Sequence, residues 1–285
     1  MIGSTPSRSA PMHSRSRTWR MPLLLVSLLV AVAVAAPLLA PHSPDVPTNY
    51  DQLARLAPSA SHPFGTDTFG RDVMSRVLYG ARVSLSLAFA SVALTLLLGT
   101  GYGAAAGLIG GAVDQWMMRA LDIALAIPRL LLLLAVTAFW RNLPVTGLVI
   151  LLGTTGWFDV ARLVRGEVQT LLTRDFLLAA VASGVPRVRV LWRHLVPHLV
   201  PLLVVSATLN VASTIALEAG LSYLGLGVQE PTASWGTILR EGTGVMDTLW
   251  WLTVFPGLVT VFAVLACHAL GDALRDLFAM DQVPA

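Results

Sequence analysis

Six stretches of the sequence are each long and apolar enough to cross a lipid bilayer as a helix. A membrane helix needs roughly 20 mostly apolar residues, and only 12% of this chain is charged, whereas soluble domains average about 25%. The stretches cover residues 21–40, 83–109, 115–139, 145–164, 199–221 and 249–270. The sequence therefore predicts an all-α integral membrane protein with about six transmembrane helices.

The basic residues predict how these helices are oriented. Four arginines precede the first stretch, with no acid among the first twenty residues, and five arginines lie between the fourth and fifth stretches. The loop between the fifth and sixth stretches instead carries three acids and one arginine. Because loops rich in basic residues remain in the cytoplasm, we expect both termini on the cytoplasmic side.

This topology divides the chain into five parts. We expect a cytoplasmic tail at 1–20, the first transmembrane helix at 21–40, an external loop with an ordered cap at 41–82, a transmembrane core at 83–270 that includes a cytoplasmic loop at 166–198, and a cytoplasmic tail at 271–285. A basic start, an apolar run and the small residues at 33–36 would also suit a cleaved signal peptide. The run is longer than most signal cores, which favours a retained helix.

The net charge of +3 does not indicate a nucleic-acid partner. The arginines are scattered beside apolar runs and form no single clustered face of the kind that nucleic-acid binding needs. We therefore attribute the positive charge to membrane topology.

The external loop is rich in residues that order a backbone. Gly65 and Gly70 permit backbone geometry closed to other residues, while Asp67, Arg71 and Asp72 can hydrogen-bond one another or cap a short helix at 72–80. His62, Asp67 and Asp72 have side chains of the kind that bind metals, but their spacing does not place all three on one helix face. The sequence predicts a structural cap and no metal site.

The cytoplasmic loop predicts two short helices that meet at a glycine. Residues 175–183 favour a helix, Gly184 ends it, and Pro186 is suited to begin the next one in its first turn. The second helix would place Val188, Leu191, Trp192 and Leu195 on one apolar face. Two interpretations remain open at this point: a projection that a partner grips, or an ordinary amphipathic surface helix.

Charged residues interrupt the third and fifth apolar stretches. Such residues are costly in a membrane and often functional. Asp122, with Arg119 one turn before it, and Glu218 are each expected either to brace the bundle or to line a pathway. Arg129 follows Pro128, where a kink is expected, and would face a wet lumen or pair with Asp122 or another subunit.

Several motifs together resemble one known family. The pattern of Ala179, Ala180, Gly184 and the Leu-x-Pro at 195–197 is similar to the "EAA" loop of bacterial binding-protein-dependent ABC importers. Further stretches resemble the C-type permeases for dipeptides, oligopeptides, nickel and glutathione; these are residues 62–80, 218–227, 231, 234–236 and 271–276. The likeness covers about residues 23–278, and the combination of motifs is specific although each alone is weak.

The resemblance implies a type I ABC importer permease in a bacterial inner membrane, surrounded by lipid. It implies a second permease subunit, an external solute-binding protein and separate ATP-binding subunits, which would hold ATP and Mg. In that family the loop docks into the ATPase and couples it to the membrane helices. Carried over by position, the ATPase-coupling residues are Ala179, Ala180, Gly184, Pro186, Arg193, His194 and Pro197. The solute would be a small peptide or a similar small solute such as nickel or glutathione.

The sequence departs from the family at one place in this loop. The usual glutamate before the two alanines is Leu178, and the usual basic residue after them is Val181. Docking should therefore depend more on apolar packing than on ion pairs.

Three other functions explain the sequence less well: a secondary transporter or channel, an intramembrane enzyme, and a structural membrane scaffold, which would not require such a cytoplasmic loop. The sequence lacks G-x-x-x-x-G-K-[ST], so no ATP site and no cofactor are expected in this chain. A secondary transporter or channel would explain the helices but not the alanine–glycine loop. An intramembrane enzyme would need a facing catalytic set, and His268 beside Cys267 does not provide one. His194 and His198, four residues apart, are expected to pack at the interface rather than to bind a metal.

Overall fold

The computed structural model describes residues 19–45, 53–140 and 143–280. Within these ranges the chain is helical apart from its loops and one isolated β-bridge between Thr66 and Asp72. The helices are α1 (Arg20–Val34), α2 (Ala36–Leu39), α4 (Val73–Ile109), α5 (Gly111–Leu125), α6 (Arg129–Phe139), α7 (Val145–Leu172), α8 (Asp175–Ala182), α9 (Arg187–Val190), the π-helix η2 (Leu191–Leu195), α10 (Val196–Tyr223), α11 (Trp235–Gly242) and α12 (Trp251–Met280). The all-α membrane fold predicted from the sequence is confirmed.

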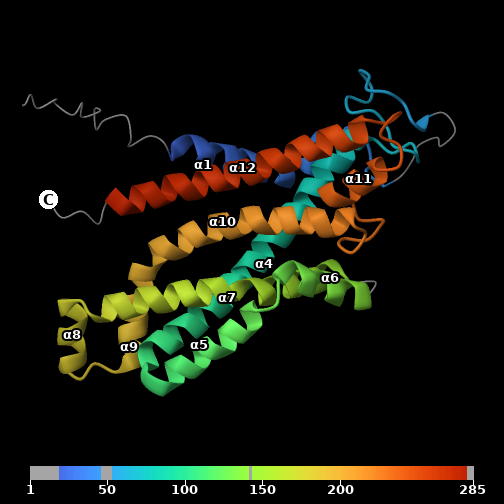
Figure 1. Cartoon of the computed structure of the whole chain (residues 1–285). Coiled ribbons are helices and arrows are strands. Elements are labelled where there is room, and N and C mark those ends of the chain that lie inside the picture. Colours follow the sequence, from blue (N-terminus) through green and yellow to red (C-terminus); the bar gives the residue numbers. More distant parts are fainter. Residues whose placement is uncertain (1–18, 46–52, 141–142, 281–285) are drawn as a thin grey trace, which may run out of the picture.

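The long helices run along one common direction, with a different structure at each end of the bundle (Figure 1). The loop that precedes α4, together with α11, forms a cap at one end. The pair α8 and α9 projects from the other end. The start of α1 and the end of α12 lie at this same end as the projection.

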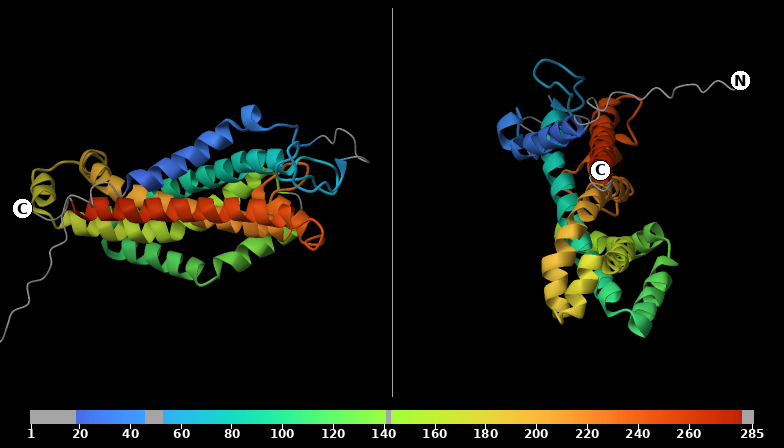
Figure 2. Two further views of the ribbon diagram at one scale, coloured as in Figure 1. Left: turned by 90° about the horizontal axis from the view of Figure 1, so that it is seen from above. Right: turned by 90° about the vertical axis from the view of Figure 1, so that its left-hand side faces the viewer.

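Four helices in the described ranges are long and apolar enough to cross a membrane: α4, α7, η2 with α10, and α12. The helices α5 and α6 together would form a fifth span, bent by 68° at the break between them. Figure 2 shows this bend as a V on the outside of the bundle. The expected first span appears as the shorter apolar helix α1, which is separated from α2 at Ala35. Pro37 lies in the first turn of α2, and a proline cannot continue a helix across this break.

Helix α4 begins ten residues earlier than the span expected at 83–109. The sequence suggested a separate short helix at 72–80, but the structure joins it to the span as one helix of 37 residues. Asp72 caps this helix by accepting a hydrogen bond from the Ser75 backbone N–H at 2.8 Å. At 1.5 Å per residue the helix is about 55 Å long, so it extends from the membrane into the cap.

The closest helix packing joins α4 to α7. Gly99, Gly103 and Gly107 lie at successive i, i+4 positions of α4, and a Cβ atom on Gly103 would lie only 2.2 Å from the carbonyl oxygen of Ala161. Small residues at this spacing let two membrane helices approach closely. This contact sets the spacing of the bundle.

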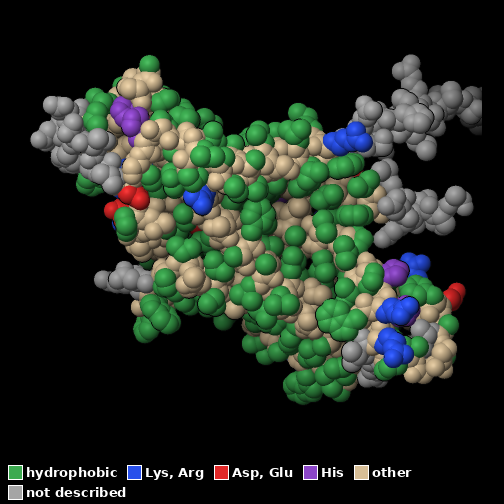
Figure 3. All heavy atoms as spheres, turned by 180° about the vertical axis from the view of Figure 1, so that it is seen from behind, with side chains coloured by type: hydrophobic (Ala, Val, Ile, Leu, Met, Phe, Trp, Pro, Cys, Tyr) green, Lys and Arg blue, Asp and Glu red, His purple; other side chains and the backbone are tan. Residues whose placement is uncertain are grey.

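The part of the bundle next to the cap has a hydrophobic core that includes Trp235 and Trp251. Trp235 is fully buried and donates from Nε1 to the carbonyl of Val77 at 3.1 Å. Trp251 donates from Nε1 to the carbonyl of Thr66 at 3.0 Å. These bonds attach α11, α12 and the cap loop to α4. Figure 3 shows hydrophobic side chains along the middle of one face, with charged groups gathered mainly toward its ends.

Candidate functional site

The cap is held by a buried network of two arginines and two carboxylates. Asp67 is fully buried, and its Oδ2 accepts from Arg71 Nε at 2.5 Å and from Arg76 Nη1 at 2.6 Å. Glu241 on α11 accepts from Arg76 at 2.5 and 2.7 Å and from Arg71 Nη2 at 3.1 Å. The expected bonding between Asp67 and Arg71 is present. The network closes only through Glu241, which fixes α11 to the start of α4.

The two cap glycines occupy backbone conformations that favour glycine. Gly65 has φ 71° and Gly70 has φ 77°. A Cβ atom on Gly65 would also lie 2.7 Å from the carbonyl oxygen of Leu56. The loop can therefore make its tight approach to α12 only with glycine at position 65.

The projection at the opposite end consists of α8, α9 and the π-helix η2 that leads into α10. Figure 1 shows α8 and α9 side by side, beyond the ends of α7 and α10. Leu177, Val190 and Leu195 are buried and pack into one cluster with residues of α7 and α10. Because η2 continues directly into α10, a force on the projection reaches a membrane helix without an intervening loop.

The outer surface of the projection carries large apolar side chains. Phe176 is 44% exposed, Leu178 53% and Trp192 68%. The expectation that Trp192 shares one apolar face with the buried Leu195 is wrong, because η2 winds more widely than an α-helix and turns Trp192 outward. No local residue pattern predicted this π-helix, although π-helical turns are frequent at functional sites.

Gly184 ends α8 with φ 75°, and no atom lies within 4 Å of a Cβ placed there. Glycine is therefore required for its backbone conformation and not for lack of space. Pro186 precedes α9 and accepts from the Arg189 and Val190 N–H groups, so it lies just before the first turn and not within it, where it was expected.

The remaining coupling-loop positions lie around this turn. Ala179, Arg193 and Pro197 are exposed, and His194 is partly buried. The side chain of Ala180 lies outside the described residues. Nδ1 of His198 lies 2.6 Å from the carbonyl oxygen of His194, and the ring stacks on Phe176.

Asp122 forms an ion pair with a residue of α7, a partner that the sequence did not indicate. Arg162 on α7 donates to its Oδ1 at 2.5 Å, and both side chains are more than half exposed. Arg119, one turn before Asp122, instead lies over the ring of Trp116. Arg119 is therefore not the partner of Asp122. Arg129 is not its partner either, because the bend after α5 directs Arg129 toward α7.

Arg129 begins α6 at this bend, next to the expected kink at Pro128. Its Nη2 donates to the carbonyl of Leu152 at 2.9 Å and its Nε to Thr155 Oγ1 at 3.4 Å. The side chain is partly buried. Arg129 therefore ties the broken span to the middle of α7 while the residue stays partly exposed.

Glu218 has the geometry of a brace. Its side chain is 1% exposed and accepts from Ser84 at 2.8 Å and from Ser222 at 2.7 Å. Ser222 in turn accepts from the Val228 N–H at 3.0 Å. The expected bond to Ser222 is present, and the carboxylate joins α4 to α10 and to the loop that follows α10.

A further ion pair was not anticipated from the sequence. Arg165 on α7 donates through Nε and Nη2 to both carboxylate oxygens of Asp114 on α5, each at 2.6 Å, and Gln169 adds a bond at 3.1 Å. From the sequence, Arg165 served only to predict the orientation of the helices. Its partner is 51 residues away, and no local pattern indicates that contact.

The sequence is similar to a family model and to several known transport proteins. Residues 97–281 match the family model described as "Binding-protein-dependent transport system inner membrane component". The oligopeptide transport system permease protein OppC of Haemophilus influenzae is 35% identical over 257 residues, covering 89% of this chain and 81% of that protein. The dipeptide transport system permease protein DppC of Bacillus subtilis is 36% identical over 256 residues, covering 89% and 79%.

A solved structure shows the same fold. The structure of the MetNI methionine ABC transporter in inward-facing conformations contains a chain that superposes with a TM-score of 0.57 at 19% identity, covering 72% of this chain and 97% of that one. Together with the matched family model and the two relatives, this similarity identifies the chain as a member of the family of binding-protein-dependent transport system inner membrane components, a membrane subunit of an ABC importer.

Proposed function

We propose that this subunit forms, with a second permease subunit, a transmembrane path for small peptides or similar small solutes. A separate ATPase drives the path through the projection of α8, α9 and η2. The names of the relatives support peptides as the solute class, since both are described as peptide transport permeases. An external binding protein delivers the solute at the capped end, and both termini lie in the cytoplasm of the cell with the projection.

The observation that carries this proposal is the exposed apolar surface of the projection. Three large apolar side chains, on Phe176, Leu178 and Trp192, point away from the buried cluster that anchors the same short helices. Trp192 lies in the first turn of the candidate span that η2 forms with α10, and α8 precedes that span; we take the projection to lie at the cytoplasmic edge of the membrane, beyond the lipid tails. An apolar surface at this place is suited to a protein partner.

A cavity near the projection supports a path along the bundle. It has a volume of about 380 Å³ and lies between the ends of α7, α10 and α12. Its lining includes the polar groups of Glu167, His198 and Arg275. A space with both charges and apolar walls suits a solute that carries an amine and a carboxylate, as a peptide does. Asp122 and Arg162 form an exposed pair, and Arg129 is partly exposed. These side chains are suited either to line the same path or to contact the second subunit.

The coupling role is tested with the complete complex in lipid nanodiscs. We expect Trp192→Glu to release the ATPase subunits, or to lower solute-stimulated ATP hydrolysis at least tenfold, because it places a charge in an apolar contact. The matched control is Met246→Glu, since Met246 is 53% exposed in the turn before α12 at the opposite end. Both variants should keep the same elution volume as the unmodified subunit.

Either of two results would refute the coupling role. One is that no ATPase ever co-purifies with the subunit. The other is that Trp192→Glu and Met246→Glu hydrolyse ATP equally well. A secondary transporter or channel would then explain the bundle better. The solute class is tested separately by competition between labelled dipeptides, longer peptides and Ni²⁺ for uptake into proteoliposomes.

A further inference from the structure

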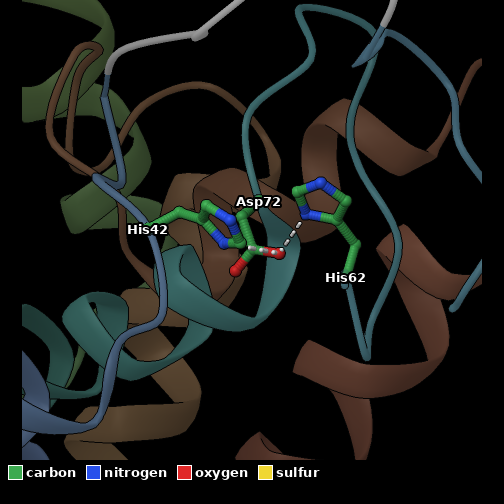
Figure 4. A group of neighbouring side chains, drawn as sticks. All are labelled: His42, His62 and Asp72. Carbon is green, nitrogen blue, oxygen red and sulfur yellow. Dashed lines mark hydrogen bonds and ion pairs between the residues drawn. The ribbon is translucent and has the colours of Figure 1, made fainter. Parts of the chain in front are cut away.

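The cap brings two histidines and an aspartate together from three separate segments. His42 follows α2, His62 lies in the loop, and Asp72 caps α4; Figure 4 shows their side chains converging beside the start of this helix. The spacing of His62, Asp67 and Asp72 along the chain predicted no metal site. In the structure Asp67 belongs to the arginine network, and His42 stands beside Asp72 instead.

The distances among these groups suit a small metal ion. His62 Nδ1 lies 2.9 Å and His42 Nδ1 3.9 Å from Asp72 Oδ1, and the three ligand atoms all lie within 4.8 Å of one another. A tetrahedral Zn²⁺ with bonds of about 2.0–2.1 Å separates its ligands by about 3.3 Å. The observed spacings lie on both sides of that value, so binding would require shifts of about 1 Å.

The three groups are already held by neighbouring hydrogen bonds. The second carboxylate oxygen of Asp72 accepts from the backbone and the hydroxyl of Ser75, at 2.8 and 2.7 Å. The same hydroxyl accepts from the His42 backbone N–H at 3.1 Å, and the His62 N–H donates to Ser59 Oγ at 3.2 Å. Metal ligands in proteins are oriented by such outer contacts, and here one serine orients two ligands.

Burial leaves one side of the cluster open. The side chains of Asp72 and His62 are 1% and 7% exposed, whereas that of His42 is 38% exposed. The imidazoles are stacked, with ring centres 4.6 Å apart. His42 can therefore move the short distance that closes the site, while the buried pair holds its position. An ion would enter past His42 and keep a water molecule as its fourth ligand.

We propose that the cap binds one Zn²⁺ ion, or a divalent transition metal of the same type, through His42, His62 and Asp72. Two imidazoles and a carboxylate are ligands suited to zinc and its neighbours, whereas Ca²⁺ and Mg²⁺ prefer oxygen ligands alone. The ion joins the segment after α2 to the start of α4. This role concerns the stability of the cap and does not depend on which solute is transported.

The test uses the full complex, purified with a tag that contains no histidine and treated with EDTA. Zinc is then counted by elemental analysis after dialysis, and Co²⁺ serves as a spectroscopic probe because tetrahedral Co²⁺ absorbs strongly in the visible range. We expect the unmodified complex to bind one more equivalent of metal per copy of this chain than His42→Ala binds. His42→Ala should weaken binding at least tenfold and remove the Co²⁺ spectrum. His268→Ala, which changes an exposed histidine on α12, is the matched control and should bind metal normally.

A second variant separates positioning from ligation. Ser75→Ala keeps all three ligands but removes the hydroxyl that holds Asp72 and the His42 backbone, and loss of an outer contact of this kind lowers metal affinity by about 10–100-fold. Zn²⁺ should also raise the Tm of the unmodified complex and of His268→Ala, but not that of His42→Ala. The proposal is wrong if the unmodified complex binds no more metal than His42→Ala, or if His268→Ala loses the metal equally; His62 and Asp72 then form only a hydrogen bond.

Discussion

The contact between α4 and α7 predicts that one added methyl group will disturb the bundle. A Cβ atom on Gly103 would lie 2.2 Å from the carbonyl oxygen of Ala161 and 3.0 Å from the Arg165 backbone nitrogen. Both atoms belong to the backbone of α7, so no side-chain rotation can relieve the overlap. In Gly103→Ala the two helices must therefore move apart by about 1 Å.

The expected size of the effect follows from two opposing terms. Overpacking a well-packed contact costs about 1–3 kcal/mol, and a radial gap of 0.5–1 Å loses a quarter to a half of each neighbouring dispersion contact. Replacing glycine by alanine within a helix gains about 1 kcal/mol. We therefore expect Gly103→Ala to lower the free energy of unfolding by about 1–2 kcal/mol.

Gly101 provides a matched control two residues away on the same helix. No atom lies within 4 Å of a Cβ placed at Gly101, so Gly101→Ala keeps the gain in helix propensity without the overlap. Both variants would be unfolded with increasing SDS in mixed micelles and followed by tryptophan fluorescence. We expect Gly101→Ala to match or exceed the unmodified chain and Gly103→Ala to unfold at lower SDS.

Equal stability of the two variants would refute the reasoning. It would mean that α4 and α7 do not approach closely in the membrane, and that the glycines at i, i+4 spacing do not set their separation. A loss of stability in Gly101→Ala alone would lead to the same conclusion, because that side of the helix would then be the packed one.

Three further perturbations test the charges of the bundle and the cap. Asp67→Asn removes one charge from a buried network, so we expect a loss of about 3–5 kcal/mol of unfolding free energy; a loss below 1 kcal/mol in denaturant would show that the arginines find other partners. Asp122→Asn breaks a pair whose side chains are 62% and 52% exposed, so stability should change by less than about 1 kcal/mol, and a larger change would indicate that the pair is buried by another subunit. Leu178→Glu places a charge on the exposed apolar surface of the projection, so it should lower solute-stimulated ATP hydrolysis as Trp192→Glu does; hydrolysis at the unmodified rate would refute a docking role for the apolar side chain at position 178.

The apolar stretches were sufficient to predict the membrane fold. Their length and low charge leave no alternative to spanning helices, because backbone groups in lipid must be satisfied within the helix. The break at Gly184 and the kink beside Pro128 were also predictable, since both follow from restrictions within a single residue. Tertiary information was needed for boundaries such as the start of α4, because Asp72 could cap either a short helix or a long one.

The partners of the charged residues were decided only by the tertiary structure. Asp67 and Arg71 are four residues apart, so the sequence showed their bond, but Glu241 joins them across 170 residues. Asp122 similarly bonds Arg162 and not its neighbour on the same helix. The choice depends on which helix faces the carboxylate, and that is set by how the helices pack and not by spacing along the chain.

The sequence by itself thus determined the class of fold, the short-range turns and the family resemblance, because hydrophobic length and backbone restrictions act locally. Only the tertiary structure placed His42 beside Asp72, turned Trp192 outward on the π-helix and joined Asp114 to Arg165. Each of these arrangements depends on contacts between segments that are far apart in the sequence. The local pattern of residues does not encode the energy of such contacts and therefore could not predict them.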